Sequence, residues 1–176
     1  LPSLEYALVD PETAGRRVPL GTTGLLLVRG PSIFNGYLNY DGPTPFVEFE
    51  GRSWYRTGDL VREDAAGRWF FAGRLKRFVK IGGEMISLPA IEEVLAAHLV
   101  RPDDEGPVLA VLATAHEAQP ELVLFTVRPV ERETVNQWLR DGGLAPLYNI
   151  RQVRPVPSIP VLGTGKTDYR ALQQAL

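Results

Sequence analysis

A lysine in a glycine-rich turn is the residue of this chain best suited to chemistry. Lys166 follows Gly163, Thr164 and Gly165 and precedes a short segment with a helical pattern. Glycine permits positive φ angles and close approach of the backbone to a ligand, and lysine carries a compact charge on a flexible stem. A lysine in such a turn is suited to stabilising a negatively charged reacting group. A solvated surface turn is the alternative.

The turn does not fit a nucleotide phosphate loop. The motif Gly-x-x-x-x-Gly-Lys-[Ser/Thr] requires glycine at position 160, where this chain has proline. Any anionic ligand of Lys166 must therefore be held in a different way.

The composition is that of an ordinary globular protein. Of 176 residues, 44% are hydrophobic and 23% are charged, and the net charge of −2 argues against nucleic-acid binding through bulk electrostatics. The absence of cysteine excludes thiolate chemistry, and the two isolated histidines lack metal-ligand spacing. No stretch approaches the ~20 apolar residues of a membrane span. The sequence begins without methionine, which suggests a piece of a longer protein.

Turn residues divide the first part of the chain into short β segments, whereas helical and strand patterns alternate later. The early strands are expected at residues 6–9, 24–29, 53–55 and 68–72. Later strands are expected at 78–81, 108–113, 122–127 and 150–156, and helices from Ser87, from about residue 133 and from residue 167 or 168. This pattern predicts an α+β protein: a β-rich unit, residues 1–75, and a unit of residues 76–176 with a short sheet and about three helices.

The aromatic residues are expected to serve packing. Trp54, Trp69, Phe70 and Phe71 fit a β core better than a platform for stacking bases. His98 is expected to be partly buried on the apolar side of its helix.

Three further motifs precede the Lys166 turn. They are Gly36-Tyr37-Leu38-Asn39, Tyr55-Arg56-Thr57-Gly58-Asp59-Leu60 and the segment from Gly73 to Glu84. In this order and spacing, the four motifs closely resemble the C-terminal third of the adenylate-forming enzymes, which include acyl-CoA synthetases, luciferases and peptide-synthetase adenylation domains. The resemblance covers essentially the whole chain. It implies the end of a large N-terminal domain, residues 1–75, followed by a mobile lid.

The resemblance implies roles for residues that meet ATP. Asp59 matches an aspartate that accepts hydrogen bonds from both ribose hydroxyls, a role suited to a carboxylate because it has only acceptors. Arg74 matches a second ribose contact. Lys166 matches the catalytic lysine that bridges the carboxylate substrate and the α-phosphate during adenylation.

The same resemblance implies roles for residues that act in the second half-reaction. Lys76 falls at the hinge about which the lid rotates. Gly82 and Gly83 match a loop that lets a pantetheine arm pass close to the backbone. Arg77 and Lys80 belong to a run of cations that offers a docking face for an acidic carrier protein.

Within the family, the chain most resembles the acyl-acyl-carrier-protein synthetase region of bacterial bifunctional 2-acylglycerophosphoethanolamine acyltransferases. The segments that carry this resemblance are residues 77–88, 121–126 and 160–169. This implies a fatty acid substrate, ATP with Mg²⁺, and acyl carrier protein as acceptor, with onward transfer to a lysophospholipid as an option. One alternative is that coenzyme A is the acceptor, and another is that the chain is a non-catalytic interaction module.

No nucleic-acid partner and no metal ligand are expected in this chain, and the expected location is the cytoplasm or the cytoplasmic face of the bacterial inner membrane. By itself the chain is expected to fold without catalysing.

Overall fold

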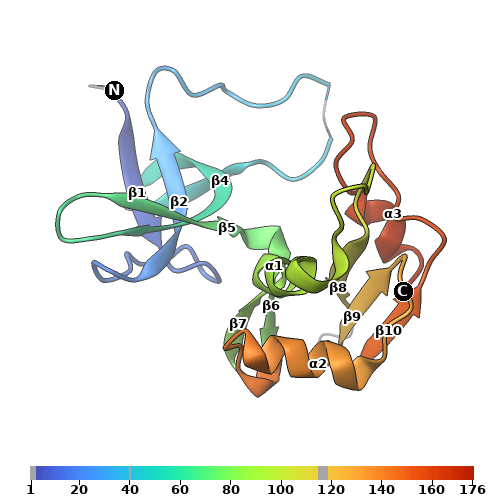
Figure 1. The fold of residues 1–176 in the computed structure, drawn as a ribbon. Coiled ribbons are helices and arrows are strands. Elements are labelled where there is room, and N and C mark those ends of the chain that lie inside the picture. Colours follow the sequence, from blue (N-terminus) through green and yellow to red (C-terminus); the bar gives the residue numbers. More distant parts are fainter. Residues whose placement is uncertain (1–2, 40, 115–118) are drawn as a thin grey trace. The chain divides into compact units, whose positions relative to one another are not determined.

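The computed structural model describes residues 3–39, 41–114 and 119–176. The chain forms two units, Leu1–Lys76 and Arg77–Leu176 (Figure 1). This division lies one residue after the boundary expected from the sequence. Within the described residues, no helix is long and apolar enough to cross a membrane.

The first unit is an antiparallel sheet in the order β1-β2-β4-β3, with β5 paired to β4. Its strands are β1 (Glu5–Val9), β2 (Thr23–Arg29), β3 (Phe46–Phe49), β4 (Arg52–Glu63) and β5 (Trp69–Arg74). The sequence did not predict β3. It also predicted only the first part of β4, because the Thr57-Gly58-Asp59 segment reads as a turn although it continues the strand.

The expectation for the aromatic residues holds for Trp54 and is wrong for the other three. Trp54 is buried, and its indole N–H donates to the Phe49 carbonyl at 3.0 Å. Trp69, Phe70 and Phe71 lie on the outer strand β5 and are 44%, 41% and 68% exposed. Two of these side chains pack against residues of other strands in the same sheet: the ring centroid of Trp69 lies 4.6 Å from that of Tyr6, and the Arg62 guanidinium lies 4.3 Å from the Phe70 ring centroid.

The second unit joins a hairpin, a three-stranded sheet and three α-helices. Its elements are β6 (Phe78–Ile81), β7 (Glu84–Ser87), α1 (Leu88–Leu99), β8 (Leu109–Ala113), β9 (Leu122–Thr126), α2 (Arg132–Asp141), β10 (Gln152–Pro155) and α3 (Tyr169–Gln173). Strand β9 lies between antiparallel β8 and parallel β10. The sequence did not predict β7, which completes a hairpin with β6.

Successive residues of β8 and β9 are buried on opposite faces of the sheet. Val111 and Leu124 join a core with α1 and α2, whereas Leu112 and Val123 join a second core with Leu172 of α3. A sheet covered on both faces needs apolar residues at every position, which explains the continuous apolar runs in the sequence. The helices α1 and α2 therefore form one layer and α3 the other (Figure 1).

Helix α1 begins as the sequence predicts. The Ser87 hydroxyl accepts a hydrogen bond from the Ala90 N–H, and Pro89 lies in the first turn. His98, by contrast, is exposed and stacks on Trp138 of α2, with 4.4 Å between ring centroids and 3° between planes. The expectation that His98 is partly buried is therefore wrong.

Candidate functional site

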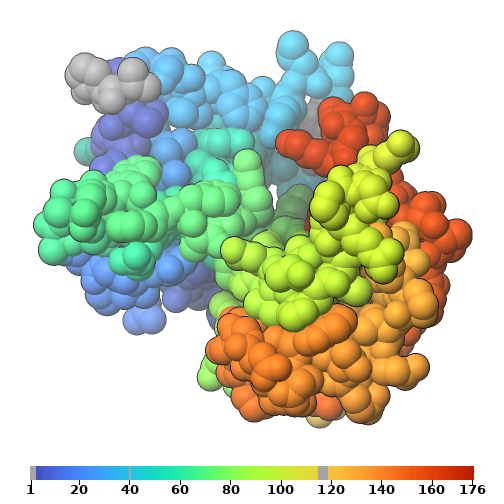
Figure 2. Space-filling model, viewed as in Figure 1, coloured from blue at the N-terminus to red at the C-terminus, as the bar shows by residue number. Residues whose placement is uncertain are grey.

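The Lys166 turn is a closed loop with the lysine near its tip. Val161 and Thr167 form an isolated antiparallel bridge, and the Leu162 N–H donates to the Lys166 carbonyl at 2.8 Å. Gly165 donates back to the Leu162 carbonyl at 2.8 Å and has φ of +80°, which favours glycine. The side chain of Lys166 is exposed, and within the described part of the chain it has no ion-pair partner. In Figure 2 this red segment lies at the surface.

The base of the loop is fixed at the start of α3. Asp168 caps this helix, because its Oδ1 accepts hydrogen bonds from Arg170 N–H at 3.0 Å and Ala171 N–H at 3.1 Å. Its own N–H donates to the Pro160 carbonyl at 2.7 Å. The loop therefore presents a cation from a backbone held at both ends.

Asp59 and Arg74 meet across the first unit's sheet, where they are register partners on β4 and β5. Nε of Arg74 lies 2.9 Å from Oδ1 of Asp59, and its Nη1 donates to the Thr57 carbonyl at 3.2 Å. The Thr57 hydroxyl accepts from the Asp59 N–H at 3.0 Å and donates to the Leu26 carbonyl at 2.9 Å. The strand pairing thus brings together the two residues that the sequence assigns to one ribose.

One oxygen of Asp59 lacks a hydrogen bond. Although Nε of Arg74 is within ion-pair distance of Oδ1, the contact does not have hydrogen-bond geometry. Among the described residues, Oδ1 is the one buried side-chain nitrogen or oxygen atom without a hydrogen-bond partner. Buried polar atoms are normally satisfied, so an unsatisfied acceptor suits a ligand that donates hydrogen bonds. A ribose hydroxyl is such a donor, and the residues present therefore fit the sugar of a nucleotide.

Gly82 and Gly83 form the two-residue turn of the β6–β7 hairpin. Their φ angles are +58° and +87°, and Ile81 pairs with Glu84 on either side. Two positive φ angles are typical of a type I′ turn, which strongly favours glycine. A Cβ on Gly83 would meet nothing within 4 Å, so the turn geometry rather than crowding explains the glycine in this structure.

A hollow of about 540 Å³ adjoins this turn within the second unit. Its lining includes Lys80 and Gly82 from the β6 side and Leu147, Asn149 and Arg151 from the segment before β10. Glu121 also lines the hollow, so two cationic side chains face one carboxylate next to the glycine turn, an arrangement that suits a phosphate-bearing ligand.

The structure argues against the docking role predicted for Arg77. Its guanidinium lies in the second unit's interior, where Nη2 is 2.6 Å from Oε1 of Glu92 and Nη1 donates to the Val111 carbonyl at 3.1 Å. The side chains of Arg77 and Glu92 are only 16% and 18% exposed. Because Arg77 is committed to this pair, the run of cations does not form a single surface patch. Lys76 and Lys80 are exposed.

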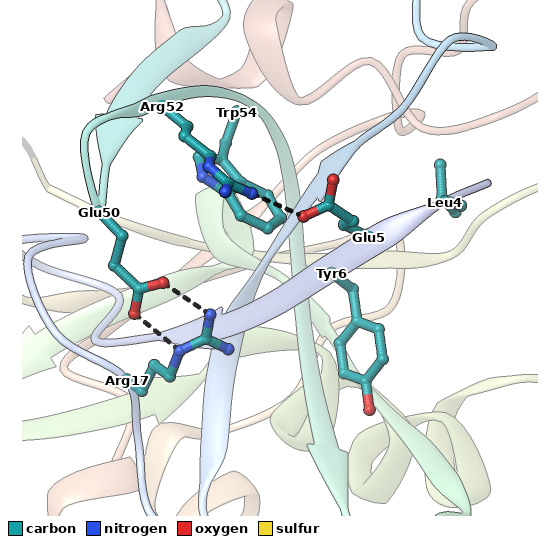
Figure 3. Close-up of a pocket in the computed structure, with 7 residues that line it drawn as sticks. All are labelled: Leu4, Glu5, Tyr6, Arg17, Glu50, Arg52 and Trp54. Carbon is teal, nitrogen blue, oxygen red and sulfur yellow. Dashed lines mark hydrogen bonds and ion pairs between the residues drawn. The ribbon is translucent and has the colours of Figure 1, made fainter.

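A second hollow, of about 510 Å³, lies on the first unit, and its lining includes none of the site residues predicted from the sequence. Figure 3 shows that its charged side chains pair with one another: Arg17 with Glu50, and Arg52 with Glu5. Cations and carboxylates that satisfy each other leave little free charge for a ligand, and so this hollow is a weaker candidate. Within the described residues, no cluster of three acidic or histidine side chains could hold a metal ion.

Sequence reasoning did not identify Glu92, Arg151 or Tyr169. Neither Arg151 nor Glu92 has a distinguishing sequence signal of its own. Tyr169 follows Lys166 by three residues, which was the available signal.

The chain is similar to several proteins that are named as ligases. It is 34% identical to 2-hydroxy-7-methoxy-5-methyl-1-naphthoate–CoA ligase of Streptomyces carzinostaticus, over 99% of this chain and 31% of the relative. It is 33% identical to 4-coumarate–CoA ligase-like 6 of Arabidopsis thaliana, over 99% of this chain and 30% of the relative. The chain thus spans about a third of the length of these curated relatives. No family model matches it.

Solved structures give the same result. ATP-bound MatB from Rhodopseudomonas palustris matches with a TM-score of 0.74 and 27% identity, over 99% of this chain and 34% of that chain. These relatives and neighbours are adenylate-forming enzymes, and the similarity is to their C-terminal region. The α+β fold class predicted from the sequence is confirmed: the described residues form several sheets and three α-helices, which match the C-terminal domain of this class.

Proposed function

We propose that this chain is the C-terminal part of an ATP-dependent, AMP-forming ligase. The enzyme converts a carboxylic acid to an acyl-adenylate and then transfers the acyl group to a pantetheine thiol. The observation that carries the proposal is the Asp59–Arg74 pair, because its buried, unsatisfied carboxylate oxygen suits a ribose hydroxyl.

In the first half-reaction, each residue has a distinct task. Asp59 accepts from the ribose hydroxyls and Arg74 holds the carboxylate in place from the neighbouring strand. Lys166, carried on its loop, stabilises the charge that develops as the carboxylate attacks the α-phosphate and pyrophosphate leaves. Mg²⁺ arrives with ATP as part of the substrate, with ligands from outside this chain.

In the second half-reaction, the acceptor thiol attacks the acyl-adenylate carbonyl and AMP leaves. We assign the hinge between the half-reactions to Lys76, which is the last residue of the first unit. The residue 1–76 unit then belongs to the large domain, and the residue 77–176 unit is the mobile lid. The hollow beside Gly82 holds the phosphate end of the pantetheine arm through Lys80 and Arg151.

The acceptor proposed on the sequence motifs is acyl carrier protein, with a fatty acid as substrate, in the cytoplasm or at the cytoplasmic face of the inner membrane. Transfer onward to a lysophospholipid is a further step of this proposal. Coenzyme A is the second candidate, favoured by the names of the CoA ligases to which the chain is similar. The burial of Arg77 removes one argument for the carrier protein.

The test uses the full-length enzyme that contains this chain. ATP–pyrophosphate exchange is measured with a panel of fatty and aromatic carboxylic acids, and thioester formation is then measured with coenzyme A and with holo-acyl carrier protein. Exchange that depends on a carboxylic acid supports the proposal, and the preferred thiol decides the acceptor. Absence of exchange with every acid, in an enzyme that binds ATP, would contradict the ligase activity.

A further inference from the structure

Three side chains from separate elements of the second unit meet at the outer edge of β8. Besides its bond to Arg77, Glu92 of α1 accepts a hydrogen bond from the Val111 N–H at 2.8 Å. The Tyr169 hydroxyl, at the start of α3, lies 3.2 Å from each carboxylate oxygen of Glu92. The guanidinium carbon of Arg77 lies 3.7 Å from the centroid of the Tyr169 ring. One cluster therefore joins α1, β8 and α3.

The position of the cluster follows from the sheet. Strand β8 is an edge strand, and Val111 has an N–H and a carbonyl that face away from β9. The Glu92 carboxylate accepts a hydrogen bond from this N–H, and the Arg77 guanidinium donates one to this carbonyl. At this edge, side chains from the α1 layer can reach the α3 layer, which lies on the opposite face of the sheet.

The cluster also leads to the Lys166 loop. The pKa of Tyr169 is raised, mainly by burial and then by the Glu92 charge. Tyr169 directly follows Asp168, whose N–H donates to the Pro160 carbonyl at the base of the loop at 2.7 Å. Thr167 is the neighbour of Lys166 and forms the bridge that closes the loop. Helix α3 has only five residues, of which Leu172 is buried, so a helix this short depends on contacts with the rest of the unit to keep its start in place.

We propose that Tyr169, held by Glu92 and Arg77, is a positioning residue for Lys166. The cluster fixes the lysine loop to Arg77, the first residue of the second unit, which follows directly after Lys76. Rotation at Lys76 would then carry Lys166 as part of one rigid body. This inference rests on the proposed function, because it assigns the adenylation step to Lys166.

The test replaces Tyr169→Phe in the full-length enzyme. Phenylalanine keeps the ring beside Arg77 but removes the hydroxyl that bonds to Glu92. We expect kcat for adenylation to fall roughly tenfold, equivalent to about 1.4 kcal/mol in the barrier. Acyl transfer from supplied acyl-adenylate is expected to change by less than about twofold, because Lys166 acts only in adenylation. The matched control is Tyr148→Phe, which removes a hydroxyl without a hydrogen bond in the described structure and should leave both rates unchanged.

A second readout does not depend on activity. Amide exchange of Leu162 and Asp168, both hydrogen-bonded within the loop, should become about tenfold faster in Tyr169→Phe, whereas the core strand β9 should be unaffected. Unchanged loop exchange, or equal loss of both half-reactions, would overturn the positioning role. If the wild-type enzyme has no ligase activity but loop exchange is still faster in Tyr169→Phe than in the wild type, the positioning of the loop is supported and the proposed function is contradicted.

Discussion

Arg74 and Asp59 face each other across β5 and β4, with 2.9 Å between Nε and Oδ1. The contact holds the carboxylate without satisfying Oδ1 by a hydrogen bond. A pair of this kind is ready for a ligand, because binding of a hydroxyl would satisfy an oxygen that the protein has already removed from water.

Replacement of Asp59 by asparagine should weaken ATP binding by roughly tenfold or more in the full-length enzyme. Hydrogen bonds to a charged acceptor contribute about 1.5–3 kcal/mol each, and the amide provides only one acceptor oxygen. The dissociation constant measured by calorimetry checks this expectation. Asp41→Asn, an exposed carboxylate of the same unit, is the control. Equal ATP affinity in the wild type and Asp59→Asn would remove Asp59 from the nucleotide site.

Replacement of Lys166 by alanine should slow adenylation by at least roughly 10²-fold, as expected for the loss of one preorganised group that stabilises developing charge. Acyl transfer from supplied acyl-adenylate should be largely retained. Lys166→Arg should not restore the rate, because a planar guanidinium cannot place its charge where an ammonium lay. The two half-reactions are measured separately, and wild-type adenylation in Lys166→Ala would make the loop an ordinary surface turn.

Charge reversal of Arg151 should raise the KM for the thiol acceptor at low salt without changing pyrophosphate exchange. Arg151 lines the hollow beside Gly82, so Arg151→Glu would repel a phosphate that approaches the turn. Arg140→Glu, on the exposed side of α2, is the matched control. If both variants raise KM equally, the effect reflects net charge and not the hollow.

Replacement of Asn136 by alanine should destabilise the second unit by about 1–3 kcal/mol, because buried backbone groups lose their partners. The Asn136 side chain accepts from the Ile150 N–H at 2.8 Å and donates to the Ile150 carbonyl at 3.0 Å. Urea denaturation followed by NMR signals of this unit gives the free energy of unfolding. Gln137→Ala, on the exposed face of the same helix, should stay within about 0.5 kcal/mol of the wild type.

The stabilisation from Asp104 should decrease in acid. Its pKa is lowered mainly by the hydrogen bond from Arg128, with Nη2 2.7 Å from Oδ1, and next by the Arg101 N–H. A lowered pKa in the folded state means that the stabilisation is complete above the unfolded value of about 3.9 and is lost as the pH falls through the folded value. The difference in unfolding free energy between wild type and Asp104→Asn should therefore shrink below about pH 4. A difference that stays constant from pH 7 to pH 3 would contradict this.

The sequence predicted the features that depend on local pattern. Ser87 marked the start of α1, and the apolar runs marked β8 and β9, because caps and buried strands have short-range signals. Strand β4 was mostly missed, since residues such as Gly58 and Asp59 are typical of turns. Ordered motifs grouped Asp59 with Arg74, and the strand register shows why they meet.

The burial of the Arg77 side chain could not be predicted, because a run of charged residues does not indicate which side chains point into the protein. Glu92 and Tyr169 are separated by 77 positions, and their contact depends on how two helices pack on opposite faces of one sheet. Such contacts have no signal in a single sequence. Only the folded structure shows these contacts.

The ion pair at the edge of β8 also has a consequence for the behaviour of the chain in concentrated solution. An uncovered edge strand can add a strand from another copy, which is a common route to aggregation. Glu92 and Arg77 occupy the outward-facing N–H and carbonyl of Val111, at the middle of that strand. The same two charges that organise the interior therefore protect the protein against self-association at this edge.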